Sequence, residues 1–201
     1  FSYGEAINPH VFKKHPYRWS VIGSFEDLSN AKLDDFKHFS KTFYVPNNAV
    51  LVVAGQIDIA QTKAWVKKYF GPIPRGEKLT KKTFVEQPIN KTITASYEDP
   101  NIQKEMVVAS YRTPSMKTRE ARVLDMISTY LSDGKSSKLY KKIVDDKKMA
   151  LQIGAFNYSL EDYGMYILYG LPQGENTAND LVREIEEEIV KLQTDWISET
   201  D

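Results

Sequence analysis

The sequence has no cysteine, and this absence excludes several kinds of chemistry at once. The 201-residue chain can form no disulfide framework, no thiolate nucleophile and no cysteine-based zinc site. It also has no net charge, since Lys plus Arg and Asp plus Glu both number 27, so no overall field attracts nucleic acid or an anionic membrane. No apolar run approaches the roughly 20 residues that cross a bilayer. The lack of cysteine suits cytoplasm and periplasm equally, and the compartment stays open.

Sequence motifs that carry chemistry are absent as well. The zinc pattern H-x-x-E-H does not occur, and His10, His15 and His38 have no second histidine at the helical spacing that places two ligands on one face. The stretch Asp133–Ser137 contains Gly-Lys-Ser, but it lacks the upstream glycine and the preceding strand of a phosphate loop. No Gly-x-Ser-x-Gly elbow is present to carry a serine nucleophile. From the residues alone, we predict no catalytic, cofactor-binding or metal-binding residue.

Clustered carboxylates occur at Asp34–Asp35, Asp145–Asp146 and Glu186–Glu188. Each cluster lies among lysines or on the polar side of an amphipathic helix, so we expect solvated faces rather than acid–base pairs. Asp34 and Asp35 precede His38 by four and three residues, which favours a surface ion pair over a metal site. The lysines of residues 78–82 are interleaved with few aromatic residues, which argues against nucleic-acid binding.

The first third of the chain is predicted to contain two helices and one buried strand. Residues 1–28 are aromatic and loop-like, and they contain two prolines. Ser29 or Asn30 is a candidate cap for the helix that follows. That helix is marked by apolar residues three and four apart, at Leu33, Phe36, Phe39 and Phe43. The β-branched run Ala49–Ala54 predicts a buried strand, and Asp58 is a candidate N-cap for the next helix.

The rest of the chain alternates strands and helices after a linker at 76–91, which contains four lysines and Pro88. Alternating residues at Ile93, Ala95 and Tyr97 predict a half-exposed strand. Further strands are predicted at 106–111, 149–159 and 163–171, with helices before Asp133-Gly134, after a Ser136 cap and after a Thr177–Asp180 capping box. The last helix has an apolar stripe at Leu181, Ile185, Ile189, Leu192 and Trp196. This order predicts an α+β fold, a two-layer arrangement of antiparallel sheet and helices.

Three stretches of the sequence resemble one known family when they are taken together. They are Tyr3–Glu5 followed by His15–Ser24, then Phe43–Gly55, and then Tyr111–Pro114 through Leu131–Tyr140. Their order and intervals are similar to those of the inverzincin zinc peptidases, the family of pitrilysin, insulysin and the mitochondrial processing peptidase. The likeness covers almost the whole chain, with Gln56 where the family usually has aspartate.

The resemblance implies a division of the chain between two similar domains, each a sheet layered with helices. Residues 1–75 would form the C-terminal part of a first peptidase-like domain, residues 76–91 a linker, and residues 92–201 the N-terminal part of a second domain. The chain starts at Phe1 without an initiator methionine or a signal-like segment, so we expect it to be an internal piece of a bacterial protein from cytoplasm or periplasm.

The resemblance also implies which catalytic groups this chain does not supply. Family members bind zinc through H-x-x-E-H and a later glutamate, and Glu5 does not match that later ligand. Complete family sites add an arginine and a tyrosine that hold the substrate carbonyl. The corresponding places here hold Val144 and Leu151, which cannot donate a hydrogen bond.

The resemblance therefore predicts a zinc-dependent endopeptidase that acts on peptides or unfolded proteins. This chain would contribute chamber wall rather than catalytic residues, the full-length protein would bind zinc, and a second half or subunit would supply the Arg/Tyr pair. No nucleic acid and no membrane span is expected. Two alternatives stay open, a non-catalytic scaffold or partner subunit of the same family, and an unrelated α+β interaction domain.

Overall fold

The computed structural model describes residues 3–102, 104–195 and 197. Within it the chain separates into two compact units. The sheet unit consists of residues 1–18 and 86–201, and the helical unit consists of residues 19–85. No helix among the described residues is long and apolar enough to cross a membrane.

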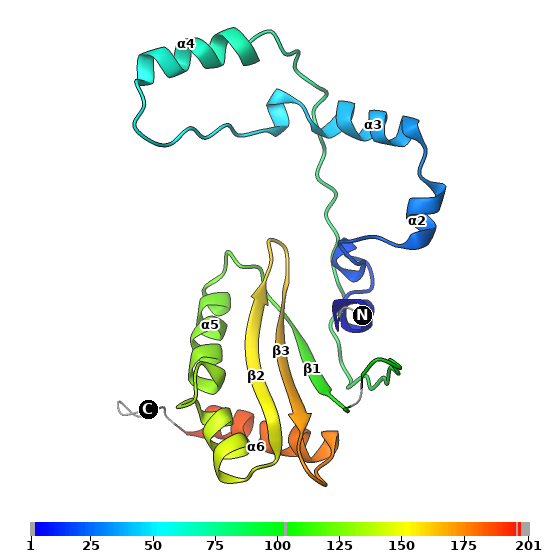
Figure 1. The fold of residues 1–201 in the computed structure, drawn as a ribbon, viewed down its shortest axis with the longest axis vertical. Helices are drawn as coiled ribbons and strands as arrows, with labels where there is room; N and C mark the ends of the chain where they lie inside the picture. The colour runs from blue at the N-terminus through cyan, green and yellow to red at the C-terminus, as the bar shows by residue number, and fades with distance from the viewer. Residues whose placement is uncertain (1–2, 103, 196, 198–201) are drawn as a thin grey trace. The chain divides into compact units, whose positions relative to one another are not determined.

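The sheet unit is built on three antiparallel strands, which Figure 1 shows side by side. They are β1 (Val107–Thr113), β2 (Ala150–Ser159) and β3 (Gly164–Pro172), in the order β1-β3-β2. β2 and β3 form a hairpin in which Ser159 lies opposite Gly164, while Val107 of β1 lies opposite Gly170 of β3. The predicted α+β fold with an antiparallel sheet is therefore confirmed.

Helices pack on one face of this sheet because their apolar stripes match the inward-facing strand residues. They are α5 (Arg119–Ser132), the π-helical segment η3 (Tyr140–Asp146) and α6 (Ala178–Thr194). The shared core buries side chains of all three and of two strands: Leu131, Leu139, Ile143, Ala150, Ile153, Ala155, Tyr166, Leu168, Leu181 and Ile185. Each fully buried Leu or Ile side chain contributes roughly 1.5–3 kcal/mol.

Threonine side chains cap the N-terminal ends of two helices in this layer. Thr118 caps α5 by accepting the Ala121 N–H, and the helix ends before Asp133 as predicted. The predicted capping box of α6 is confirmed, since Thr177 and Asp180 exchange backbone-to-side-chain hydrogen bonds. The predicted stripe of α6 reaches the core, although Trp196 lies outside the described residues.

A second, smaller cluster lies on the opposite face of the sheet. Residues of α1 (Tyr3–Val11) and the turn after it pack there against Met165 and Ile167, which alternate along β3 with the core residues Tyr166 and Leu168. The expectation of a loop over residues 1–28 is therefore wrong at its start, because α1 continues through a proline near its end. The short helix η1 (Pro16–Arg18) follows.

The helical unit contains three α-helices joined by extended chain (Figure 1). They are α2 (Phe25–Asn30), α3 (Leu33–Phe43) and α4 (Ile59–Phe70), with a 3-10 turn η2 at Pro46–Asn48. Asp58 caps α4 by accepting the Gln61 N–H, as predicted. The candidate caps Ser29 and Asn30 are wrong, since both lie inside α2, which Ser24 caps.

Two predicted strands are not strands in this structure. Residues 49–54 are extended but pair with no other segment among the described residues, and Val50 is 90% exposed. Residues 92–98 likewise form no strand, and Tyr97 is exposed. A β-branched run becomes a buried strand only where a neighbouring strand takes its backbone N–H and C=O groups and another layer covers its side chains.

Candidate functional site

The two positions that the family resemblance singled out lie close to the junction of η3 and β2. Val144 is half-buried in η3 and packs against the main core. Leu151 is 48% exposed and is the extra residue where the register of β2 shifts between Ala150 and Gln152. Both side chains are hydrocarbon, so neither position offers a hydrogen-bond donor to a substrate.

The backbone between these two positions is unusual. Seven residues, Tyr140–Asp146, form a π-helix, and Lys147 N–H donates to the Lys142 carbonyl. Lys148, just beyond, has φ of 54°, a left-handed conformation that is uncommon for a residue with a side chain. π-helical turns are rare and are frequent at functional sites. Here the π-helix directs Lys142 toward the glutamates of α6.

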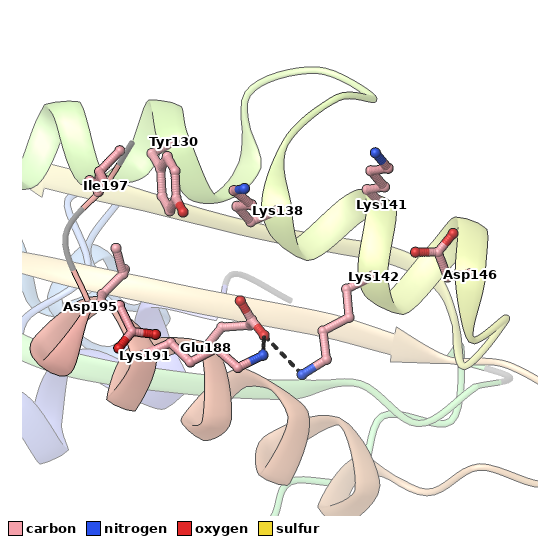
Figure 2. Close-up of a pocket in the computed structure, with 10 residues that line it drawn as sticks. Tyr130, Lys138, Lys141, Lys142, Asp146, Glu188, Lys191, Asp195 and Ile197 are labelled. Carbon is pink, nitrogen blue, oxygen red and sulfur yellow. Dashed lines mark hydrogen bonds and ion pairs between the residues drawn. The ribbon is translucent and has the colours of Figure 1, made fainter. Parts of the chain in front are cut away.

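A polar pocket of about 420 Å³ opens between this helix and α6. Figure 2 shows its lining, which consists of Tyr130, Lys138, Lys141, Lys142, Asp146, Glu188, Lys191, Leu192, Asp195 and Ile197. Lys138 lies over the Tyr130 ring, with its Nζ 5.4 Å from the ring centre. Lys191 donates to Glu188 at 2.8 Å. Both lysines and carboxylates therefore line the pocket.

Lys142 is the centre of an ion network beside this pocket. Its Nζ lies 2.9 Å from Glu184, 3.0 Å from Glu187 and 2.9 Å from Glu188, while Lys147 lies 2.5 Å from Glu184. Burial by itself would lower the pKa of Lys142, but the hydrogen bonds from its ammonium group to the three glutamates outweigh burial and raise that pKa. Burial would raise the pKa of Glu184 and Glu188, yet the neighbouring lysines hold both below the ordinary value.

This network corrects one expectation from the sequence. Glu188 does not lie on a solvated face, because its side chain is only 11% exposed, and Glu184, one turn earlier in α6, is only 12% exposed. Glu187 is 59% exposed and matches the expectation better. The missed signal is the pair of lysines, Lys142 and Lys147, on the helix that precedes β2. Because Lys142 pairs with three glutamates of α6 and Lys147 pairs with Glu184, the arrangement fastens η3 to α6.

The second polar cluster is buried near the start of the chain. The Glu86 side chain is 1% exposed, and its Oε1 accepts the backbone N–H groups of Lys13, Lys14 and His15 at 2.9, 2.6 and 2.7 Å. Burial by itself would raise the pKa of Glu86, but these three hydrogen bonds and the Arg112 guanidinium hold it below its ordinary value. Sequence reasoning missed this residue, since it lies in the predicted linker.

Arg112 completes the cluster from β1. Its Nη1 lies 3.3 Å from Glu86 Oε2 and donates to the Val11 carbonyl at 2.9 Å, and its Nη2 donates to the Gln87 carbonyl. The guanidinium also lies 5.9 Å from the centre of the Tyr163 ring. A buried charge needs this many partners, because an unpaired one is expensive to remove from water.

The three histidines are not gathered into a metal site. His15 is buried, its Nδ1 accepts the Tyr17 N–H, and its Nε2 therefore carries the proton shared with Asp162 at 3.3 Å. His10 contacts Tyr97 in a hydrogen bond of 2.8 Å. The expected pair between His38 and the aspartates is wrong in detail, because Asp34 pairs with Lys37 and Asp35 accepts the Lys32 N–H. Among the described residues no three potential metal ligands lie together.

The remaining motif that the sequence singled out is a turn. Asp133–Ser137 connects α5 to the next helix, with Gly134 at φ of 74° and the Ser137 hydroxyl donating to the Gly134 carbonyl at 2.8 Å. The element before this turn is a helix, whereas a phosphate loop follows a strand. The Gly-Lys-Ser sequence therefore serves as a helix connection.

The fold has clear relatives among known proteins. A sequence model described as the peptidase M16 inactive domain matches residues 30–201. The chain belongs to the peptidase M16 family. This is the pitrilysin-type family that the three stretches indicated, so that prediction is confirmed.

Relatives of this M16 chain carry zinc-protease names. It is 29% identical over 189 residues to the zinc protease PqqE of Helicobacter pylori, an alignment covering 93% of this chain and 43% of that protein. It is 25% identical over 196 residues to the uncharacterized zinc protease YmxG of Bacillus subtilis, covering 96% and 46%. The chain thus spans less than half the length of these relatives.

Solved structures agree with the fold. A crystal structure of a protease from Helicobacter pylori matches with a TM-score of 0.79 and 26% identity, over 94% of this chain and 46% of that one. A crystal structure of a peptidase M16 inactive domain from Pseudomonas fluorescens matches with a TM-score of 0.75 over 97% and 47%. The identity in the second case is 11%, so that likeness concerns the fold alone.

Proposed function

We propose that this chain is a non-catalytic part of a zinc-dependent endopeptidase that cleaves peptides or unfolded proteins inside a chamber. Its contribution is chamber wall. Zinc belongs to the full-length protein, and a second family half or subunit supplies the arginine and tyrosine that hold the substrate carbonyl. The observation that carries this proposal is the match to the M16 inactive domain over residues 30–201, joined with hydrocarbon side chains at Val144 and Leu151.

The assignment of domains is part of the proposal. Residues 1–75 belong to the end of a first peptidase-like domain, 76–91 to a linker and 92–201 to the start of a second domain. The lengths of the relatives support this assignment, because this chain accounts for only 43–46% of each of the two zinc proteases compared above. The names of those relatives support zinc in the full-length protein.

The experiment compares the 201-residue chain with the full-length protein. Zinc is measured per chain by mass spectrometry, and cleavage is followed with a fluorogenic peptide, an unfolded protein and the same protein folded. We expect no stoichiometric zinc and no turnover from the chain alone. The full-length protein, supplied with its partner half, should hold zinc, cleave the peptide and the unfolded protein, spare the folded one and lose activity to a chelator.

The outcomes separate the alternatives. Stoichiometric zinc together with turnover by the 201-residue chain would overturn the proposal. A full-length protein that binds neither zinc nor peptide, but forms a stable complex with a second family member, would point instead to a scaffold subunit.

A further inference from the structure

Helix η3 contains one residue more than an α-helical turn would need. The helix begins with α-helical bonding, because the Lys141 N–H donates to the Ser137 carbonyl, four residues earlier, at 2.9 Å. At its end the Lys147 N–H donates to the Lys142 carbonyl, five residues earlier, at 3.0 Å. A change from four to five residues per hydrogen bond defines a π-helical turn. One surplus residue is therefore held between Lys142 and Lys147.

The connection from η3 to β2 is short and strained. It consists of Lys147, Lys148 and Met149, and Lys148 has φ of 54°, in the left-handed region that is unfavourable for a residue with a side chain. Met149 is held on both sides, since its N–H donates to the Ile143 carbonyl at 2.9 Å and its carbonyl accepts the Gln173 N–H at 2.8 Å. A connection with one more residue would relieve this strain.

Ion pairs with α6 favour the π-helical register of η3. Lys142 Nζ lies 2.9 Å from both Glu184 and Glu188, and Lys147 Nζ lies 2.5 Å from Glu184. Figure 2 shows Lys142 pointing toward Glu188. Residues five apart in an α-helix lie about 140° apart around its axis, because each residue turns the chain by about 100°. Lys142 and Lys147 would then face different directions, so their shared contact with Glu184 depends on the π-helical turn.

We propose that Tyr140–Leu151 is a segment with two registers, and that the ion pairs of Lys142 and Lys147 with α6 hold the surplus residue inside η3. When these pairs are broken, η3 becomes α-helical and the surplus residue passes into the connection to β2. In that register the Lys147 N–H bonds to the Ile143 carbonyl, four residues earlier, and the strain at the connection is released.

This segment joins the two positions that the family resemblance singled out. Val144 lies inside the π-helical turn, and Leu151 is the extra residue of the bulge in β2. A π-helical turn, a left-handed Lys148 and a β-bulge thus follow one another closely, and backbone irregularities of these kinds are concentrated at active sites and switch regions. The inference depends neither on zinc nor on proteolysis, so the proposed function can fail without it.

The hydrogen-bond acceptor of the Lys147 amide reports the register directly. Scalar couplings across hydrogen bonds, measured by NMR on the 201-residue chain, should join this amide to the carbonyl of residue 142. In Lys142→Met the coupling should pass to the Ile143 carbonyl, and Glu184→Gln, which weakens the pairs of both lysines, should shift it in the same direction. Lys141→Met is the matched control and should leave the coupling at residue 142. Retention of that coupling in both Lys142→Met and Glu184→Gln would overturn the inference.

A deletion tests the surplus residue and keeps the ion pairs. Removing the exposed Asp145 leaves Lys142 and Lys147 four residues apart, on one face of an α-helical turn, so the urea midpoint should change little. Removing the exposed Met126 from the regular helix α5 is the control. That deletion rotates half of the apolar stripe by about 100° away from the core, and the midpoint should fall at least about three times as far. Equal losses in the two deletion variants would contradict a stored residue in η3.

Discussion

Glu86 and Arg112 form an ion pair of 3.3 Å between two almost fully buried side chains. Glu86 also accepts hydrogen bonds from the backbone N–H groups of residues 13–15, and Arg112 donates to the carbonyl groups of Val11 and Gln87. The pair therefore joins three stretches of the sheet unit that are far apart in sequence. Because each group satisfies several others, removing either one leaves buried polar atoms without partners.

Replacing Glu86 should be costly. Glu86→Ala leaves Arg112 without its carboxylate and three backbone N–H groups without an acceptor, and we expect a loss of about 3–5 kcal/mol in the free energy of unfolding. Urea unfolding of the 201-residue chain, followed by circular dichroism, measures this loss. Glu161→Ala is the control, because Glu161 pairs with Lys117 on the surface and should cost no more than about 1 kcal/mol. Equal effects of the two substitutions would contradict the role of Glu86.

Acid should weaken the sheet unit through the same carboxylate. The pKa of Glu86 is held below its ordinary value of 4.5, so between the two values the unfolded state binds more protons than the folded state. Stability is fully present above pH 4.5 and is lost as the pH falls through the lowered pKa. Glu184 and Glu188 contribute in the same direction. Unfolding free energies measured from pH 6 to pH 2 should fall less steeply in Glu86→Gln, and an unchanged slope would contradict the prediction.

The ion network of η3 and α6 should behave as one unit. Lys142→Met removes the ammonium group that Glu184 and Glu188 share in a mostly buried site and leaves each with one lysine, Lys147 or Lys191, so we expect a loss of about 1–3 kcal/mol. Adding Glu188→Gln should recover part of that loss, because it removes the repulsion between the two neighbouring carboxylates. A double-mutant cycle by urea unfolding measures the coupling. Lys141→Met, at an exposed neighbouring lysine, is the control, and full additivity of the first pair would contradict the network.

Introducing the family's arginine at Val144 and its tyrosine at Leu151 should change the stability of the chain by different amounts. Val144→Arg brings a charge to a half-buried site that packs on the core, and we expect a loss of about 1–3 kcal/mol. Leu151→Tyr places a larger ring at a bulge where the side chain is 48% exposed, so its effect should stay within about 1 kcal/mol. Thermal or urea unfolding of the single variants checks both. A destabilising Leu151→Tyr with a neutral Val144→Arg would reverse the expectation.

Local patterns predicted much of the sheet unit because their causes lie within a few residues. The strand predicted at 106–111 is β1, and the predicted hairpin strands are β2 and β3 with nearly the same bounds. The Thr177–Asp180 box and the Asp58 cap act over three residues, so sequence spacing reveals them. Ser29 failed as the cap of α3 because it lies inside a separate short helix, α2, and the N-cap position of α3 is Lys32.

At Ala49–Ala54 the sequence pattern and the structure disagree. Its six apolar residues favour burial. A strand forms only when a neighbouring strand supplies the other half of each ladder hydrogen bond. The tertiary structure decides which segment supplies that partner. The alternating residues around Tyr97 form no strand for the same reason, since alternation does not provide a neighbouring strand.

By itself, the sequence determined the order of helices and strands from β1 to α6, the caps of α4 and α6, the family and the hydrocarbon side chains at Val144 and Leu151. Only the tertiary structure decided which charges are buried and what balances them. Glu86 meets residues 71–73 positions away, and Lys142 meets glutamates more than forty positions away. Local spacing encodes helix and strand, whereas the partner of a buried charge depends on which distant elements the core brings together.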